Sequence, residues 1–415
     1  PAEIGNLTNL VWLNFVHNQL TGEIPSSICN LDMNWSDPNN FNISENQLCP
    51  PYPECIEEYV GDQDTTNCNK ADENTVWYIS IEGSDGNDGS EESPFATIQY
   101  GLDSAGGGDT VMVGLGGYIE NIIWPFTPRI KLIGSGEDSC IIDGDSSGIV
   151  IAFLDSVNGL IDTNTLITGF TIQNGYSDGE KPGGGIYCSN ASPMITDCTI
   201  KENFSHGLDG YGGGIALVDN ANMTLLNVKI HNNDARGIRL PGMGYRYKGK
   251  GGGLFIVDSD PVFTDVEIMD NFAGEYGGGV YILHSSPIFT NFTISGNGGS
   301  GILQKGGGVL CEAGSYATFI GGSISDNGNS DVRWGAMLGG GIAVGGTLLD
   351  SSSFHVELTD VLIQDNASRM VGGGVYGRHI SLSGCTIIEN SATYNGGGIY
   401  SDGEIDFSPT NRCNI

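Results

Sequence analysis

The chain has 415 residues, among them 66 glycines, and its 50 acidic side chains against 16 lysines and arginines give a formal net charge of −34 at pH 7. A surface this negative repels nucleic acid and anionic lipid, so we expect neither as a partner. No apolar stretch is long enough to cross a bilayer as a helix, and abundant glycine favours turn-rich β structure. We therefore expect an extracellular or cell-surface protein without membrane insertion.

The first segment spaces apolar residues around a single asparagine. These positions are Leu7, Leu10, Leu13, Phe15, Asn18, Leu20, Gly22, Ile24, Pro25 and Ile28. The segment resembles one full plant-type leucine-rich repeat, LxxLxLxxNxLxGxIPxxI. The resemblance implies a short strand with buried leucines, an Asn18 side chain bonded to the turn, and proteins as partners of this segment. Because Pro1 and Ile415 both fall inside repeats, we expect a fragment of a longer secreted protein.

Four cysteines follow this repeat closely: Cys29, Cys49, Cys55 and Cys68. No Cys-x-x-Cys pair occurs among them, so disulfides are favoured over a metal site. Pairing as Cys55–Cys68 or Cys29–Cys49 would close a cap, although the connectivity does not follow from the sequence. We assign residues 1–71 to the end of the repeat and its cysteine-rich cap.

Residues 75–110 predict an opening strand, a polar turn and a short helix. These elements lie at Trp77–Ile81, Gly83–Gly89 and Thr97–Ala105. The oxygen-bearing side chains of the turn that could bind a metal are Asp85, Asn87 and Asp88. Such hard oxygen ligands suit Ca²⁺, whereas the alternative is an Asx turn that leads into the helix. Calcium is thus the one ion under consideration, and the sequence requires no cofactor.

The string from Gly83 to Asn121 resembles the opening segment of secreted right-handed parallel β-helix proteins, a group that includes pectate-lyase-like enzymes. In that group a helix plugs the first coil and hides its apolar end. The resemblance covers roughly residues 75–415 and implies a fold rather than an activity. We therefore expect an all-β protein, a right-handed parallel β-helix solenoid over residues 75–415 that follows the leucine-rich segment.

Two recurring sequence motifs support the same fold. Three consecutive glycines before an aliphatic residue begin at Gly183, Gly212, Gly251, Gly277, Gly306, Gly339, Gly372 and Gly396. Isoleucine followed three residues later by asparagine occurs at Ile200/Asn203, Ile230/Asn233, Ile268/Asn271, Ile294/Asn297, Ile324/Asn327, Ile363/Asn366 and Ile387/Asn390. A repeat that keeps both motifs while the residues between them vary is typical of a solenoid. The glycines suit a tight bend, and the asparagines an internal ladder at a corner that needs left-handed backbone.

Alignment of the coils on the glycine triplet assigns side chains to faces. The residue after each triplet is aliphatic, and by period-two alternation it shares the inward face with the residue two positions later. This places Cys188 and Cys311 inside, and the second strand places Cys198 and Cys385 inside in the same way. We predict that all four are buried apolar residues rather than reactive or metal-binding groups.

The residue between those two positions is predicted to face solvent and is often aromatic. The aromatic members are Tyr187, Phe255, Tyr281, Tyr376 and Tyr400. The variable loops before the triplets add the ligand candidates Arg239, Arg246, Lys248, Lys250, Arg333 and Trp334. Aromatic faces stack on sugar rings and arginine forks bind carboxylate or sulfate, so together they indicate an elongated groove for an acidic glycan. In the alternative, the outward rings stack on one another and the loops are merely solvated.

These features favour a non-catalytic binding or adhesion protein that displays the strip to polysaccharides or cell-surface glycans. The alternative, implied by the resemblance, is a Ca²⁺-dependent polysaccharide lyase or a glycoside hydrolase working in the same groove. β-Helix lyases use a lysine or arginine base, which would be Lys248 or Arg246 here, with Asp258 or Asp260 in reach of a metal. A structural fibre subunit, which needs no groove, is the third hypothesis.

Overall fold

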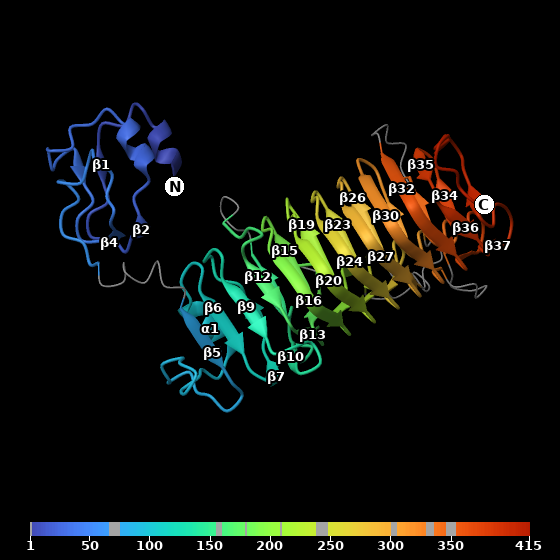
Figure 1. Ribbon diagram of the computed structural model, residues 1–415, viewed down its shortest axis with the longest axis horizontal. Coiled ribbons are helices and arrows are strands. Elements are labelled where there is room, and N and C mark those ends of the chain that lie inside the picture. Colours follow the sequence, from blue (N-terminus) through green and yellow to red (C-terminus); the bar gives the residue numbers. More distant parts are fainter. Residues whose placement is uncertain are drawn as a thin grey trace. The chain divides into compact units, whose positions relative to one another are not determined.

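The computed structural model describes residues 2–65, 75–154, 160–178, 181–207, 210–237, 248–299, 305–328, 336–345 and 354–415. The chain forms two compact units, Pro1–Thr75 and Val76–Ile415 (Figure 1). Within the described residues, no helix is long and apolar enough to span a membrane.

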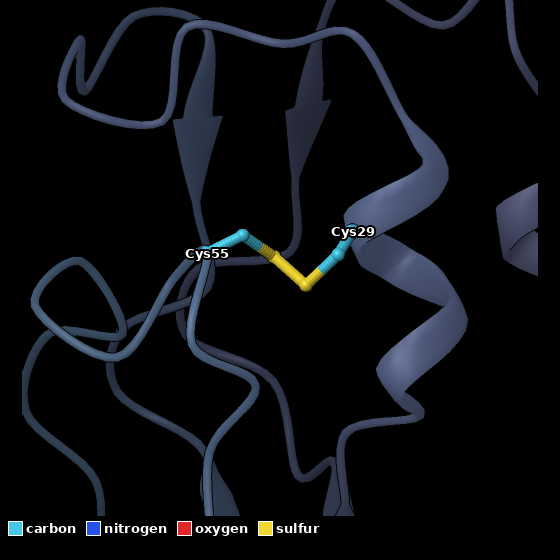
Figure 2. The surroundings of a disulfide bond; sticks show 2 residues. All are labelled: Cys29 and Cys55. Carbon is cyan, nitrogen blue, oxygen red and sulfur yellow. A yellow bond between two sulfur atoms is a disulfide. The ribbon is translucent and has the colours of Figure 1, made fainter.

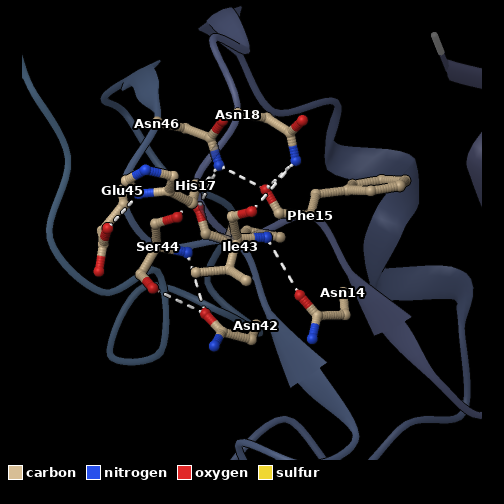
Figure 3. A network of polar contacts seen from close by, with 10 residues as sticks. Asn14, Phe15, His17, Asn18, Asn42, Ile43, Ser44, Glu45 and Asn46 are labelled. Atoms are coloured by element: carbon tan, nitrogen blue, oxygen red, sulfur yellow. Dashed lines mark hydrogen bonds and ion pairs between the residues drawn. The ribbon is translucent and has the colours of Figure 1, made fainter.

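The first unit contains two successive turns of chain that pair in parallel. Their elements are η1 (Ala2–Asn6), β1 (Leu13–Asn14) and β2 (Thr21–Glu23), then η2 (Ser26–Asn30), β3 (Phe41–Asn42) and β4 (Gln47–Cys49). β1 pairs with β3, and β2 pairs with β4. The Asn18 side-chain amide donates to the Phe15 carbonyl at 2.9 Å, and Asn46 of the next turn donates to the same carbonyl at 2.8 Å (Figure 3). Asparagine thus holds the turn backbone, while the assignment to a leucine-rich repeat stays a prediction.

A disulfide bond joins Cys29 to Cys55 in this unit, with their Cα atoms 5.7 Å apart (Figure 2). The two pairings that the sequence suggested, Cys55–Cys68 and Cys29–Cys49, are therefore wrong. The physical reason is packing, because η2, which carries Cys29, buries its apolar side in the same cluster as Ile56, the neighbour of Cys55. Cys49 is also disulfide-bonded, and Cys68 lies outside the described residues.

The second unit opens with β5 (Val76–Ile79), α1 (Ile98–Ser104) and β6 (Thr110–Val113). Thr97 caps α1, because its side chain accepts a hydrogen bond from the Tyr100 amide. Ile98 and Leu102 are fully buried in the same apolar cluster as the strands of the coils. The helix therefore packs on the apolar interior at the start of the unit.

The polar turn before α1 serves the helix. Asp85 accepts hydrogen bonds from the amides of Ala96 and Thr97 at 2.9 and 3.0 Å, and from the Thr97 hydroxyl at 3.0 Å. Asp88 accepts one from the Ser90 amide, which lowers the pKa of its carboxyl. The Asp88 contact is that of an Asx turn, whereas the Asp85 contacts tie the turn to the start of α1. In the described part of the chain, no group of three or more His, Cys, Asp or Glu side chains is placed to hold a metal ion. The calcium site, which includes Asn87, stays a prediction.

From β6 onward the chain winds through three parallel sheets (Figure 1). The triplet sheet, whose strands mostly follow glycine triplets, contains β8 (Ile122–Ile123), β11 (Ile151–Phe153), β15 (Ile186–Ser189), β19 (Ile215–Val218), β23 (Leu254–Val257), β26 (Val280–Leu283), β29 (Val309–Cys311), β31 (Ile342–Val344), β34 (Val375–Gly377) and β38 (Ile399–Tyr400). The short-strand sheet contains β14 (Tyr176–Ser177), β17 (Phe204–Ser205), β21 (Asp234–Ala235), β25 (Phe272–Ala273) and β28 (Gly298–Gly299).

The long-strand sheet includes β5 and β6 and covers the remaining side of the coils. Its other strands are β7 (Gly116–Ile119), β9 (Lys131–Gly134), β10 (Cys140–Asp143), β12 (Leu166–Thr168), β13 (Thr171–Gln173), β16 (Met194–Lys201), β20 (Thr224–His231), β24 (Val262–Met269), β27 (Ile288–Ser295), β30 (Tyr316–Ser325), β32 (His355–Gln364), β35 (Ile380–Ser383), β36 (Thr386–Ile388) and β39 (Ile405–Phe407). Two small parallel pairs are β18 (Gly210–Tyr211) with β22 (Gly249–Lys250), and β33 (Ala367–Ser368) with β37 (Ser391–Ala392). This arrangement confirms the predicted parallel β-helix.

Equivalent residues of successive coils stand in register and form the core. Val280 pairs with Leu254 on one side and Val309 on the other, and all three are fully buried. The cysteines predicted to be buried are all fully buried: Cys188, Cys198, Cys311 and Cys385. Burial raises the pKa of the Cys198 thiol to about 12, so little thiolate forms at neutral pH.

The repeated asparagines form the predicted internal ladder. The Asn271 side-chain amide donates to the Ile230 carbonyl at 2.8 Å and to the side-chain oxygen of Asn297 at 3.0 Å. The same oxygen of Asn297 accepts the Asn271 backbone amide at 3.0 Å. The left-handed backbone, however, belongs to the preceding residue, as at Asp270 with φ 53°. The asparagine therefore supplies hydrogen bonds at the corner, and its neighbour makes the bend.

The glycine triplet is needed for conformation and for space. Gly251 has a φ of 63°, which a residue with a side chain rarely adopts. A Cβ on Gly252 would lie 2.4 Å from the Gly278 carbonyl oxygen of the next coil. The first glycine thus makes the bend, and the second lets neighbouring coils approach.

Candidate functional site

The outward column of the triplet sheet is covered rather than exposed in the middle of the β-helix. Tyr281 is fully buried, and Phe255 is only 8% exposed. The Phe255 ring stacks on Tyr211 and Tyr281, with ring centroids 4.9 and 5.4 Å apart. The expected solvent-facing aromatic strip is therefore wrong here, and the alternative of rings stacked along the sheet is correct. The physical reason is a second apolar cluster, in which Tyr211 and Tyr276, the residues just before two triplets, pack against the column.

Among the remaining residues of the predicted glycan groove, Tyr187 and Tyr376 pack against the same apolar cluster as the covered column. Tyr187 is half-buried, and the half-buried rings of Tyr376 and Tyr400 stack on each other at 6.0 Å. Lys248 is exposed. The predicted groove residues that lie outside the described part of the chain are Arg239, Arg246, Arg333 and Trp334. Among the predicted cations, Lys250 stands in an organised cluster.

Lys250 belongs to a column of alternating tyrosines and lysines, which we call the tyrosine–lysine row. Tyr211 pairs with Lys250, Lys250 with Tyr276, and Tyr276 with Lys305. The glycine after each row residue fixes this register, as when the Gly251 amide donates to the Tyr276 carbonyl at 3.0 Å. All four row side chains are half-buried. The sequence places Tyr211, Tyr276 and Lys305 in the variable loops directly before glycine triplets, but the pattern did not mark them as ligand candidates.

Lys250 is held by aromatic rings and by a buried phenol. Its ammonium donates a hydrogen bond to the Tyr281 hydroxyl at 3.0 Å, and that hydroxyl donates to a carboxylate oxygen of Glu312 at 2.5 Å. The ammonium also lies 4.6 Å from the ring centroid of Tyr281 and 5.7 Å from that of Tyr276, within range of a cation–π interaction. The chain Lys250–Tyr281–Glu312 therefore spans three neighbouring coils and fixes the ammonium in place.

The environment shifts the pKa values of neighbouring row residues in opposite directions. Burial lowers the pKa of the Lys305 amine from its usual 10.5, against a smaller opposing effect of Glu312 and Asp402. Burial, reinforced by Glu275 and Glu312, raises the pKa of the Tyr276 phenol above its usual 10.0. Lys305 thus loses its proton more readily than an ordinary lysine, whereas Tyr276 keeps its proton more firmly than an ordinary tyrosine.

Three functional groups with different chemistry therefore lie on adjacent coils, whose backbones are about 4.8 Å apart. Lys305 can act as a base, Tyr276 can donate a proton, and the fixed Lys250 ammonium can pair with an anion. Groups whose environments separate their pKa values in this way are typical of acid–base sites.

The column continues past Lys305, and the chain neighbours of its next members line a cavity. The next members of the column are Leu338, Val371 and Asn395. The cavity has a volume of about 430 Å³, and its lining includes Met337, Ser368, Arg369, Met370 and Tyr394. The Ser368 hydroxyl is buried and has no hydrogen-bond partner among the described residues.

The sequence pattern of the family described as "Right handed beta helix region" matches residues 129–307 and 247–411. One curated relative is the uncharacterized protein YwoF of Bacillus subtilis (strain 168), 30% identical over 156 residues. That alignment covers 35% of this chain and 31% of the relative, so the chain spans less than a third of the relative's length.

Several solved structures are similar in fold at low identity. The complex of XylC with xylose aligns with a TM-score of 0.47 and 9% identity, covering 77% of this chain and 70% of that one. The A-module of the Azotobacter vinelandii mannuronan C-5 epimerase AlgE6 gives 0.40 and 16%, covering 75% and 94%. The pectate lyase Pel9A gives 0.40 and 11%, covering 82% and 78%. These likenesses concern the fold and leave the activity to be argued from the site.

Proposed function

The chain belongs to the right-handed β-helix family, and from this premise we propose that it is a lyase that cleaves an acidic polysaccharide at the tyrosine–lysine row. The observation that carries the proposal is the row itself. It sets a lysine of lowered pKa and a tyrosine of raised pKa beside a fixed ammonium on three successive coils. A lyase that cleaves a uronate polymer needs a base, a proton donor for the departing oxygen and a cation that pairs with the carboxylate. Lys305, Tyr276 and Lys250 could fill these three roles.

The proposed step is a β-elimination. The neutral Lys305 amine takes the proton from the carbon beside the uronate carboxylate, and the released electron pair forms a carbon–carbon double bond. The bond from the next carbon to the glycosidic oxygen breaks, and the Tyr276 phenol protonates the departing oxygen. Lys250 pairs with the carboxylate while negative charge builds on it. This assignment replaces Lys248 and Arg246 as candidate bases, since Lys248 is exposed and Arg246 lies outside the described residues.

The test is incubation of the protein with polygalacturonate and with alginate while ultraviolet absorbance is followed. Elimination creates a conjugated double bond, so we expect absorbance to rise with at least one polymer. Replacement of Lys305 by Met should abolish the rise, and replacement of the exposed Lys248 by Met should leave it unchanged. A wild-type protein that binds these polymers without any rise in absorbance would contradict the lyase.

A second candidate function is non-catalytic binding of the same acidic polysaccharides. It is favoured by the Lys250–Tyr281–Glu312 chain, whose hydrogen bonds hold the ammonium rigidly, as a binding surface requires. In that case the polymers should bind without a change in absorbance, and replacement of Lys250 by Met should weaken binding. Equal binding by this variant and the wild type would exclude the row as the contact surface.

A further inference from the structure

Two cysteines outside the tyrosine–lysine row are register neighbours near the end of the described chain. The Asn414 amide donates to the Cys385 carbonyl at 2.8 Å, and the Ile387 amide donates to the Asn414 carbonyl at 2.8 Å. These bonds pair Thr386 with Asn414 in a parallel bridge. Cys385 and Cys413 directly precede the paired residues, so their backbones lie about 4.8 Å apart and their side chains point to the same face.

Both side chains point to the core of the coils. Cys385 is fully buried, and Cys413 is half-buried and packs against the same apolar cluster. Burial raises the pKa of the Cys385 thiol, and the neighbouring Cys413 thiol, which hydrogen-bonds with it, adds to the rise. The two sulfur atoms are therefore within contact distance. Cα atoms of bonded cysteines lie about 4.4–6.8 Å apart, a range that includes the spacing of these neighbours.

The other buried cysteines of the coils lack this arrangement. Cys311 stands in register between Ile282 and Val344. Cys188 stands between Phe153 and Leu217. A thiol neighbour in register is thus a specific property of the pair near the end of the chain, not a general result of the cysteine-rich core.

We propose that Cys385 and Cys413 form a disulfide bond when the protein meets a small-molecule disulfide oxidant. The half-buried Cys413 reacts first, because its thiolate can reach the oxidant and displace one thiol from it, which leaves a mixed disulfide on Cys413. The Cys385 thiolate then attacks the Cys413 sulfur and displaces the second thiol. One oxidant disulfide is reduced to two thiols, and the two cysteines lose one proton and one electron each.

The surroundings in which this protein folds permit such a reaction. The same chain carries the Cys29–Cys55 disulfide, and disulfides persist in oxidising compartments. The new bond would fasten the segment around Asn414 to β36 covalently, in addition to the hydrogen bonds and apolar packing that hold it now. The proposal does not depend on the function proposed above.

The test is peptide mapping by mass spectrometry without reduction, after the folded protein has been equilibrated with oxidised and reduced glutathione. We expect a linked peptide pair that contains Cys385 and Cys413, lighter by two hydrogen atoms than the separate peptides. Hydrogen exchange at the Asn414 amide should slow by at least about tenfold on oxidation, because the crosslink opposes local opening.

Matched variants separate this bond from general thiol oxidation. Replacement of Cys413 by Ala should abolish the linked pair and the slower exchange, whereas replacement of Cys311 by Ala should leave both unchanged. Because the map of the wild-type protein needs no variant, the test stands even if a variant fails to fold. The proposal is overturned if both cysteines remain thiols at equilibrium, if Cys413 stays a glutathione adduct, or if either links to a different cysteine.

Discussion

Two columns of polar residues run along the same coils and differ in how they are built: the asparagine ladder comes just after the long strands, and the tyrosine–lysine row comes directly before the glycine triplets. The asparagine ladder repeats one residue type, is almost fully buried, and satisfies each amide, as at Asn271. The tyrosine–lysine row alternates two residue types and is half-buried, and burial displaces the pKa values of two of its members, Tyr276 and Lys305. The asparagine ladder uses one residue type and stabilises the fold through satisfied hydrogen bonds. The tyrosine–lysine row combines different side chains, as an acid–base site requires.

We expect substitutions in the two columns to have different consequences. Removal of a ladder residue should cost stability, because buried partners lose their hydrogen bonds. Removal of a row residue should cost activity while the fold persists.

Replacement of Lys305 by Met should lower kcat/KM for elimination by roughly 10²–10⁴, because a positioned general base contributes about that much. The free energy of unfolding should change by less than about 1 kcal/mol, since the methionine keeps the apolar stem of the side chain. Ultraviolet assays and urea titrations measure the two quantities. Activity equal to that of the wild type would remove Lys305 from the mechanism.

Replacement of Asn271 by Ala should lower the free energy of unfolding by about 3–5 kcal/mol, because the Asn233 amides and the Ile230 carbonyl lose their buried partner. Asn390, at the half-buried end of the ladder, provides the matched control, and its replacement should cost clearly less. Urea unfolding of both variants decides the point. Equal losses of unfolding free energy at the two sites would show that burial does not determine how much a ladder asparagine contributes to stability.

Replacement of Tyr281 by Phe should cost about 1–3 kcal/mol of stability, because Lys250 and Glu312 both lose a buried hydrogen-bond partner. The ring stack on Phe255 should persist, since the ring itself is unchanged. Unfolding titrations give the cost, and polysaccharide binding shows whether the released ammonium still contacts the polymer. A neutral effect on both measurements would mean that the chain Lys250–Tyr281–Glu312 is dispensable.

The pH dependence of kcat/KM should show a rising limb whose midpoint lies below 10.5, the usual lysine value, because burial lowers the pKa of Lys305. The sign follows from the mechanism: only the neutral amine is a base, so activity is lost as falling pH protonates it. A falling limb should lie above 10.0, because the Tyr276 phenol with its raised pKa donates a proton only while it keeps one. Stopped assays across this range measure both limbs, and a profile without a rising limb would contradict the assignment.

The fold could be predicted from the sequence because the glycine triplets and the Ile/Asn pairs recur at fixed positions in most of the coils. The same periodicity predicted the burial of Cys188 and Cys311. It failed for the outward column, since side chains from the variable stretches before the triplets cover Tyr281 and no repeat describes them. The Cys29–Cys55 bridge could not be derived either, because the packing of η2 decides it.

The site could be predicted only in part. Lys250 was identified from its loop, but its partner Tyr281 lies in the next coil and Glu312 in the coil after that. A sequence read one coil at a time cannot show such contacts. The pKa of Lys305 depends on burial, which follows from the same packing between coils.

The most direct test of the tyrosine–lysine row as an acid–base site is a titration of the Lys305 amine, followed by NMR in protein labelled at its lysine side chains and assigned with the Lys305→Met variant. We expect a midpoint below 10.5 that moves when an acidic oligosaccharide binds. A midpoint at or above 10.5, unmoved by the oligosaccharide, would contradict the acid–base site.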